Sequence, residues 1–173
     1  MWVTGHRSEF VAMDVVDLGA GPRLHEVFAG FRAETFAVML DAAAVPAAWS
    51  ILAVGPAWVL SAWASARTAL DGSGLIELRA WGAERFGCAP ATTRRFEGRP
   101  FEELARMLEA SALPEALRAQ VRGPLACGAI GVAGYDAGRF LERWPERAQR
   151  DIDVPELCFL FVDAAFVLEH ATG

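Results

Sequence analysis

The spacing of glycines over residues 123–144 constrains the fold of this chain more than any other feature. Four of them interrupt an apolar run there: Gly128, Gly131, Gly134 and Gly138. Glycine inside a strand marks a bulge or the close approach of another backbone, because it has no Cβ to clash. The segment is therefore predicted to contain a strand, over residues 128–136, that bends or packs tightly. It lacks the GxGxxG order of a phosphate loop, and Tyr135-Asp136 follows it rather than a helix.

The composition favours a single globular domain, expected to span residues 1–173. Hydrophobic residues make up 54% of the chain, which is ample for a core. The net charge of -6 argues against nucleic acid as a partner, because phosphate binding needs a cationic face. No lysine occurs, which excludes a Schiff-base lysine, a P-loop lysine and a lysine nucleophile.

Cysteine and histidine residues are few and scattered. The cysteines form no CxxC pair, which favours a reducing cytoplasm over a disulfide framework. They are Cys88, Cys127 and Cys158. The histidines lie too far apart for a metal site to be recognised, and we expect surface or packing roles for them. They are His6, His25 and His170.

Residues 42–66 form an uncharged run of 25 residues, long enough to cross a bilayer. Pro46 and Gly55-Pro56 interrupt it, and its tryptophans are scattered rather than placed at its two ends. Buried strands give uncharged runs of the same kind. We therefore expect strands here and no membrane span. The N-terminal residues also lack the apolar segment of a signal peptide.

Hydrophobic periodicity and turn residues predict a chain dominated by short strands. Strands are expected at residues 10–18, 35–41, 49–54, 58–64, 75–81, 128–136 and 157–168. Helices are expected from residue 24 to near Gly30, from Pro100 onward, at 114–120, and as one turn at 140–144. Residues 82–99 lack periodicity and are predicted to be loop. Short links between the strands favour antiparallel pairing, so the predicted class is α+β with mostly antiparallel sheets.

A series of short motifs follows these elements in order. They are Val38-Met-Leu-Asp-Ala42, Trp49-Ser-Ile-Leu-Ala-Val-Gly-Pro56, Pro100-Phe101 with Leu104, Gly128-Ala-Ile-Gly-Val-Ala-Gly-Tyr-Asp136, Leu141-Glu-Arg-Trp-Pro145, and Asp151 with Pro155. The series resembles the N-terminal region of the component I enzymes that act on chorismate, aminodeoxychorismate synthase and anthranilate synthase. The resemblance covers residues 10–173 and implies part of an α/β/β/α sandwich of two stacked sheets.

The resemblance also implies where the chemistry lies. In these enzymes a C-terminal domain carries the Mg²⁺-binding glutamates and, in many aminodeoxychorismate synthases, a catalytic lysine. This chain has no lysine and no acidic pair with metal-site spacing. We therefore expect it to be catalytically silent by itself, without catalytic residues, metal or cofactor. Its implied partners are a C-terminal chorismate-binding domain and a glutamine amidotransferase subunit that supplies ammonia.

The region that this chain resembles holds tryptophan in a buried pocket, whose wall includes a Leu-Leu-Glu-Ser and an Arg-Tyr-Ser motif. The corresponding residues here are Leu40, Asp41, Ala42, Trp49 and Ser50. Asp41 keeps an acid that could meet an ammonium group, and Ser50 keeps its hydroxyl. Ala42 and Trp49 each lack a hydroxyl of that pattern, which costs a buried polar ligand roughly 1–3 kcal/mol each. The alternative is that Leu40 and Trp49 are core residues and Ser50 satisfies backbone groups.

Three functions stay open from the sequence. The first is the N-terminal domain of an aminodeoxychorismate synthase component I, whose parent enzyme aminates chorismate on the path to 4-aminobenzoate and folate. The second is the equivalent domain of an anthranilate synthase component I, in tryptophan biosynthesis. The third is a stand-alone amino-acid-binding module or a scaffold for an amidotransferase. If part of a two-sheet sandwich is missing, uncovered apolar strands also predict a homodimer or larger species.

Overall fold

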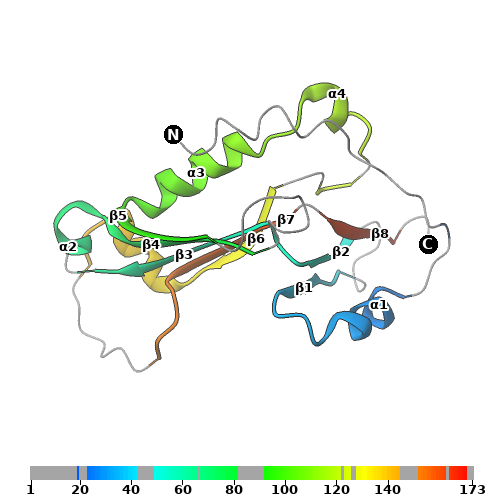
Figure 1. The fold of residues 1–173 in the computed structure, drawn as a ribbon, viewed down its shortest axis with the longest axis horizontal. Coiled ribbons are helices and arrows are strands. Elements are labelled where there is room, and N and C mark those ends of the chain that lie inside the picture. The colour runs from blue at the N-terminus through cyan, green and yellow to red at the C-terminus, as the bar shows by residue number, and fades with distance from the viewer. Residues whose placement is uncertain are drawn as a thin grey trace. The chain divides into compact units, whose positions relative to one another are not determined.

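The computed structural model describes residues 19, 23–42, 49–65, 67–81, 92–121, 123–125, 128–144, 152–162 and 164–170. Its strands are β1 (Ala37–Leu40), β2 (Trp49–Val54), β3 (Trp58–Ala64), β4 (Gly74–Ala80), β5 (Thr93–Gly98), β6 (Gly128–Ala133), β7 (Leu157–Val162) and β8 (Ala165–Glu169). Its helices are α1 (Leu24–Phe31), α2 (Thr68–Asp71), α3 (Pro100–Ala110), α4 (Glu115–Arg118) and the 3₁₀ helix η2 (Tyr135–Phe140) (Figure 1). The strand predicted at residues 10–18 lies outside the described residues.

The strands form two sheets, which lie in two compact units. The first unit comprises residues 1–55, 109–128 and 163–173, and the second comprises residues 56–108 and 129–162. The first holds a three-stranded sheet in the order β1-β2-β8, and the second a five-stranded sheet in the order β5-β4-β3-β7-β6. The predicted α+β class with antiparallel sheets is confirmed. The expected span of one domain over residues 1–173 stays a prediction.

Helix α1 packs on one face of the small sheet. Its apolar residues recur at helical spacing, and its last one, Phe31, lies with its ring centroid 5.9 Å from that of Phe166 on β8. Phe166 pairs with Leu52 on β2, so both belong to the face beneath α1. At the start of the helix, the Arg23 backbone amide donates to the Glu26 carboxylate at 3.3 Å. This bond satisfies a backbone donor at the point where the chain enters α1.

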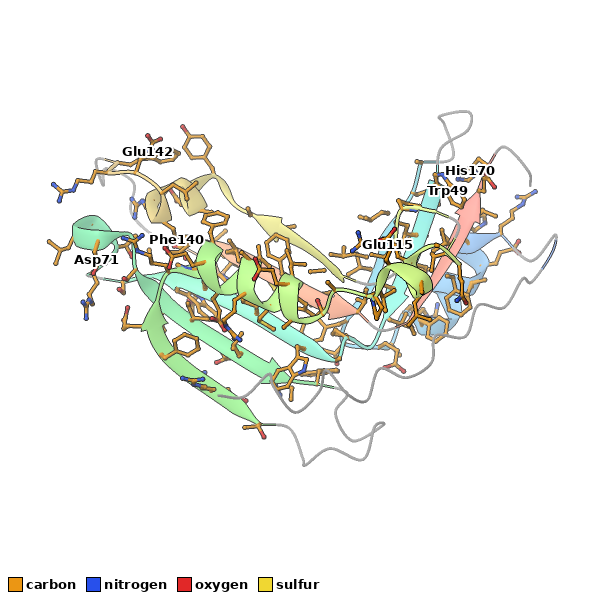
Figure 2. All side chains as sticks on the ribbon, turned by 90° about the horizontal axis from the view of Figure 1, so that it is seen from above. Trp49, Asp71, Glu115, Phe140, Glu142 and His170 are labelled. Atoms are coloured by element: carbon orange, nitrogen blue, oxygen red, sulfur yellow. The ribbon has the colours of Figure 1, made fainter. Side chains whose placement is uncertain are left out.

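The large sheet carries the main core of the second unit. Alternate residues of its central strands point to one face and are completely buried, among them Leu60, Ile76 and Leu157. Leu104 of α3 and Phe140 of η2 pack into the same cluster. The Phe140 ring also meets Phe101 of α3 edge-on, with centroids 6.4 Å apart (Figure 2). Helix α3 and η2 thus cover one face of this sheet.

Two of the glycines in the glycine-spaced segment stand where another group leaves no room for a side chain. A Cβ on Gly131 of β6 would lie 2.2 Å from the carbonyl oxygen of Cys158 on β7. A Cβ on Gly138 would lie 2.6 Å from the indole of Trp144, whose ring also lies 4.9 Å from that of Tyr135. The predicted close packing of this segment is confirmed at these two positions.

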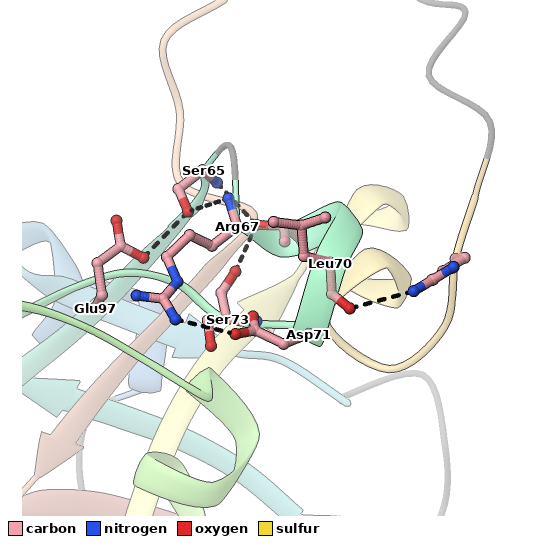
Figure 3. Close-up of polar contacts among 8 residues, drawn as sticks. Ser65, Arg67, Leu70, Asp71, Ser73 and Glu97 are labelled. Atoms are coloured by element: carbon pink, nitrogen blue, oxygen red, sulfur yellow. Dashed lines mark hydrogen bonds and ion pairs between the residues drawn. The ribbon is translucent and has the colours of Figure 1, made fainter.

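Polar contacts fix the turn between β3 and β4 (Figure 3). Helix α2 ends at Gly72, which takes a positive φ of 74°. The Asp71 carboxylate accepts the Ser73 backbone amide at 2.9 Å and the Arg67 guanidinium at 3.3 Å. The Thr68 hydroxyl donates to the Ser73 carbonyl at 2.6 Å. The chain therefore reverses here within one short helical turn.

Two predictions about strands were wrong. Residues 93–98 lie in the predicted loop but form β5, because pairing with β4 and an Arg95–Glu77 ion pair at 2.5 Å stabilise a strand with little hydrophobic alternation of its own. Residues 157–168 were predicted as one strand but form β7 and β8, which belong to different sheets. Asp163 is the one charged residue in this stretch and falls in sequence between the two strands, a mark that the prediction of a single strand passed over.

A candidate ligand site in the first unit

A cavity of about 240 Å³ opens on the face of the small sheet that α1 covers. Residues at the start of α1 and at the ends of all three strands contribute to it. Its lining consists of Arg23, Leu24, His25, Asp41, Ser50, Leu168 and His170. It is the one place in the described part of the chain where we find an acid, a hydroxyl and two imidazoles around a common space.

Ser50 lies at the centre of the polar contacts of this cavity. Its side chain is completely buried, and its hydroxyl donates to Asp41 Oδ1 at 2.9 Å. The Ser50 hydroxyl oxygen accepts the Ala42 backbone amide at 2.9 Å and lies 2.7 Å from Nε2 of His170. A serine hydroxyl has one proton to donate and two lone pairs to accept. All three are therefore used.

This arrangement fixes the tautomer of His170. Because the only hydroxyl proton of Ser50 goes to Asp41, Nε2 of His170 must be the donor in their 2.7 Å contact. In the neutral ring Nδ1 is then the nitrogen that carries no proton.

The same geometry argues against Ser50 as a nucleophile. In a Ser-His-Asp triad the histidine accepts the serine proton and the acid orients the histidine. Here the serine proton points to Asp41, and the imidazole donates to the serine oxygen. The cluster can orient and bind a ligand, but it is not set up for acyl transfer.

The structure brings part of the predicted site together. Asp41 and Ser50 line the cavity, and the Ala42 amide bonds to Ser50. Trp49 lies on the opposite face of β2, because successive residues of a strand alternate, and its ring packs against Gly123, where a Cβ would lie 3.1 Å away. Leu40 pairs with Ile51 on the face of Trp49 and is 47% exposed. Neither Trp49 nor Leu40 lines the cavity.

Sequence reasoning missed the two histidines and Arg23. His25 and His170 are far apart along the chain, and each was expected to have only a surface or packing role. Both line the cavity, His25 from the start of α1 and His170 from the end of β8. The pairing of Ser50 with Leu168 is what brings β8 alongside β2, and this register cannot be found from the composition of either strand.

Displaced pKa values belong to side chains of the second unit. Hydrogen bonds from the Ser73 backbone amide and hydroxyl, with the nearby Arg67, hold the pKa of Asp71 below its usual value. The hydrogen bonds that the Arg106 guanidinium donates to the Glu103 carboxylate raise the pKa of Arg106. Among the described residues, no group of three or more His, Cys, Asp and Glu side chains is placed to hold a metal ion. The described chain likewise has no helix long and apolar enough to span a membrane.

Comparison with known proteins finds similarity to two kinds of component 1. The chain is 35% identical to aminodeoxychorismate synthase component 1 of Salmonella typhimurium over 83 residues, 48% of this chain and 18% of that protein. Over 47 residues it is 40% identical to the protein of that name from Escherichia coli, covering 27% of this chain and 10% of the relative. It is 34% identical to anthranilate synthase component 1 1 of Haloarcula marismortui over 111 residues, 62% of this chain and 23% of that protein. No family model matches.

These similarities confirm the resemblance to the component 1 enzymes. The matched segments span between 10% and 23% of the length of these curated relatives. Since those relatives are each named as component 1, they belong to enzymes that have a further component.

Proposed function

We propose that this chain is the N-terminal, non-catalytic domain of an aminodeoxychorismate synthase component I. The observation that carries the proposal is its 35% identity to the Salmonella typhimurium component 1 over 83 residues. The parent enzyme would aminate chorismate with glutamine-derived ammonia on the path to 4-aminobenzoate. In this proposal the enzyme works in the cytoplasm.

The chemistry of the parent enzyme lies outside this chain in the proposal. In this proposal Mg²⁺ belongs to the C-terminal chorismate-binding domain. The domain packs against that C-terminal domain, and the whole component works with a glutamine amidotransferase subunit. The role of this chain is then to complete the fold and to offer a ligand site of its own.

That ligand site is the cavity around Asp41 and Ser50. Asp41 provides an acceptor for an ammonium group, while Ser50, whose hydroxyl oxygen accepts the Ala42 backbone amide, forms the wall next to it. Trp49 and Leu40 act from the opposite face of the sheet, where Trp49 supports β2 by packing against Gly123. We include them as supporting residues and not as ligand contacts.

A chimera tests the proposed function. The matching N-terminal region of the Escherichia coli aminodeoxychorismate synthase component 1 is replaced by this chain, in a strain that lacks the native gene. Growth without added 4-aminobenzoate is expected. A chimera with Gly131→Val provides the matched negative control, because any Cβ at that position meets the backbone of β7. A chimera that is made at normal levels and supports no growth would contradict the proposal.

The longer match to the anthranilate synthase component 1 1 of Haloarcula marismortui, 111 residues, favours the second candidate. The equivalent chimera is built on an anthranilate synthase component 1 and tested for growth without tryptophan. Growth in this background alone would replace the first proposal with the second. Growth in both would show that the domain is structurally interchangeable between the two enzymes.

The cavity itself favours a third candidate, a stand-alone module that senses an amino acid or serves as a scaffold. Calorimetry of the purified chain with tryptophan and related amino acids tests it. Specific micromolar binding together with failure of both chimeras would support the sensor. Absence of amino-acid binding would leave the role of a structural domain.

A further inference from the structure

The two edges of the five-stranded sheet differ in charge. The strand order β5-β4-β3-β7-β6 makes β5 and β6 its edge strands (Figure 1). Strand β5 carries three exposed charged side chains, Arg94, Arg95 and Glu97, whereas β6 carries none. Charged side chains keep a free edge from pairing with another chain, because the N–H and C=O groups of that edge otherwise serve as a template. The composition of β5 is thus typical of an edge that stays in solvent, and that of β6 is not.

The exposed part of β6 is its C-terminal half. Ile130 is buried, whereas the three residues after it are exposed, and Val132 is 65% exposed. The neighbours of Val132 are Gly131 and Ala133, whose small size leaves the backbone open to an approaching strand. No strand of the described chain lies beyond β6. A strand that paired here would take up backbone groups at the edge and cover the Val132 side chain.

An ordered pair of aromatic rings follows the exposed end of β6. Tyr135 is 86% exposed, and its ring centroid lies 4.9 Å from that of Trp144. The Trp144 indole donates from Nε1 to the Glu142 carboxylate at 2.6 Å and packs on Gly138. Aromatic side chains that are exposed but already held in place lose little freedom on binding and contribute strongly at interfaces. The surface suited to a partner therefore continues past the end of the strand.

The lengths of the relatives favour a tethered strand over a second copy of the chain as the partner of β6. The matched segments make up 10% to 23% of the curated relatives, so most of each relative is polypeptide outside the matched part. A strand of the same polypeptide is held near the edge at a high effective concentration, in the millimolar range for short flexible links. Few contacts are then sufficient, which suits an edge with three exposed residues. A second copy lacks this advantage and occupies the edge only where the tethered strand is absent.

We propose that the edge of β6 is completed by a strand from another part of the same component 1 polypeptide. This inference rests on the proposed function in taking the chain as one domain of a longer component 1, and it names the surface that the second domain joins. The incoming strand is short and uncharged, with an apolar side chain next to Val132 and a group that packs on Tyr135. Backbone hydrogen bonds supply the affinity in strand addition, and side-chain contacts supply the selectivity.

Hydrogen exchange of the chimera with the Escherichia coli component 1 tests the inference. The peptide of residues 128–136 is compared between the chimera and the isolated chain at high dilution, and the peptide of residues 93–98 on β5 serves as the internal control. We expect amide exchange of the first peptide to be about tenfold slower in the chimera, because strand addition engages backbone groups at the edge, and exchange of the control peptide to be equal in both. Equal exchange of residues 128–136 in the two proteins would overturn the inference.

Two further outcomes of the exchange experiment would assign the edge to another partner. Protection of residues 128–136 that the isolated chain gains on concentration, and that the chimera loses on dilution, would assign the edge to a second copy. Protection that appears only after the amidotransferase subunit is added would assign it to that subunit. Either result would overturn the inference.

Matched variants place the same charge on opposite edges of the sheet. Val132→Lys adds a lysine to β6, and Thr93→Lys adds one to the exposed start of β5. In the chimera we expect the first to lower the Tm by about 2–4 °C and the second to leave it unchanged. In the isolated chain at high dilution neither is expected to lower the Tm, since both positions are exposed. Equal effects of the two variants in the chimera, or an equal effect of Val132→Lys in both proteins, would overturn the inference.

The outcome is distinguishable from the growth test of the chimera. A chimera that supports growth while residues 128–136 exchange as in the isolated chain would overturn this inference and leave the proposed function in place. A folded chimera that protects these residues but supports no growth would overturn the proposed function and support the pairing at β6.

Discussion

Ser50 Oγ and His170 Nε2 lie 2.7 Å apart although 120 residues separate them in the chain. The contact joins the start of β2 to the residue that follows β8. Asp41, which follows β1, accepts the proton of the same hydroxyl. One buried oxygen therefore connects the ends of all three strands of the small sheet.

Loss of that oxygen should destabilise the fold. Ser50→Ala leaves the Ala42 amide and the His170 ring without their acceptor, and the free energy of unfolding is expected to fall by about 1–3 kcal/mol. Urea unfolding followed by circular dichroism measures it. Ser61→Ala is the matched control, a buried strand serine whose hydroxyl reaches Cys158 Sγ at 3.7 Å, and it is expected to lose less. Equal losses would contradict the role given to Ser50.

Gly131 should not tolerate even a methyl group. Gly131→Ala places a Cβ 2.2 Å from the Cys158 carbonyl oxygen, which requires β6 to move away from β7. Overpacking of this kind costs about 1–3 kcal/mol. Gly134→Ala is the control, since its Cβ would lie 3.4 Å from the Glu156 carbonyl and its φ of -66° suits alanine. The prediction fails if chemical denaturation finds both variants equally stable.

Stability should respond to acid through Asp71. Its pKa is lowered in the folded state, chiefly by the hydrogen bond from the Ser73 backbone amide. Such a group stabilises the fold above its unfolded pKa near 3.8 and loses this contribution as the pH falls through the lower folded value. Asp71→Asn is therefore expected to lower the Tm at neutral pH, with a gap that closes in the acid range. A gap that stays constant from pH 7 down to pH 2 in thermal melts would contradict it.

The core of the second unit should depend on Leu60. Its side chain is 0% exposed, and Leu60→Ala is expected to cost about 2–5 kcal/mol through lost burial and the cavity left behind. Leu70→Ala is the control, since Leu70 is 71% exposed, and is expected to change stability by about 0.5 kcal/mol or less. Equilibrium unfolding of both variants provides the comparison.

The purified chain should self-associate through β6. This strand lies at the edge of the five-stranded sheet, and its Val132 is 65% exposed. An exposed edge with apolar side chains is a template for pairing with another chain, and lysine on an edge strand prevents it. We expect a dimer or larger species in size-exclusion chromatography with light scattering, and a shift toward monomer in Val132→Lys. Leu70→Lys, on the short helix α2 that joins β3 to β4, should have no such effect. A monomeric wild-type chain at all concentrations would exclude this association.

Much of the fold could be predicted from local patterns. The boundaries of β2 and β3 follow from apolar runs between turn residues, and α3 follows from Pro100 and a helical stripe. The strand β5 could not be predicted because its stability comes from pairing with β4. The separation of β7 from β8 was missed because Asp163 alone interrupts an otherwise apolar stretch, and one charged residue does not show that the chain changes sheet.

Part of the candidate site could also be predicted from local sequence patterns, and part could not. Asp41 and Ser50 could be found because short motifs surround them, and both line the cavity. His170 could not, because it reaches Ser50 only through the register of β8 on β2. Trp49 was grouped with Ser50 by adjacency in the sequence, and strand alternation places it on the other face.

Tyr135 is a residue of the second unit that can be labelled chemically. It is the single tyrosine of the chain, it is 86% exposed, and its ring lies against Trp144 just beyond the end of β6. Nitration or iodination would thus mark one known site beside the sheet edge. A label at that site would report directly whether another chain or domain approaches β6.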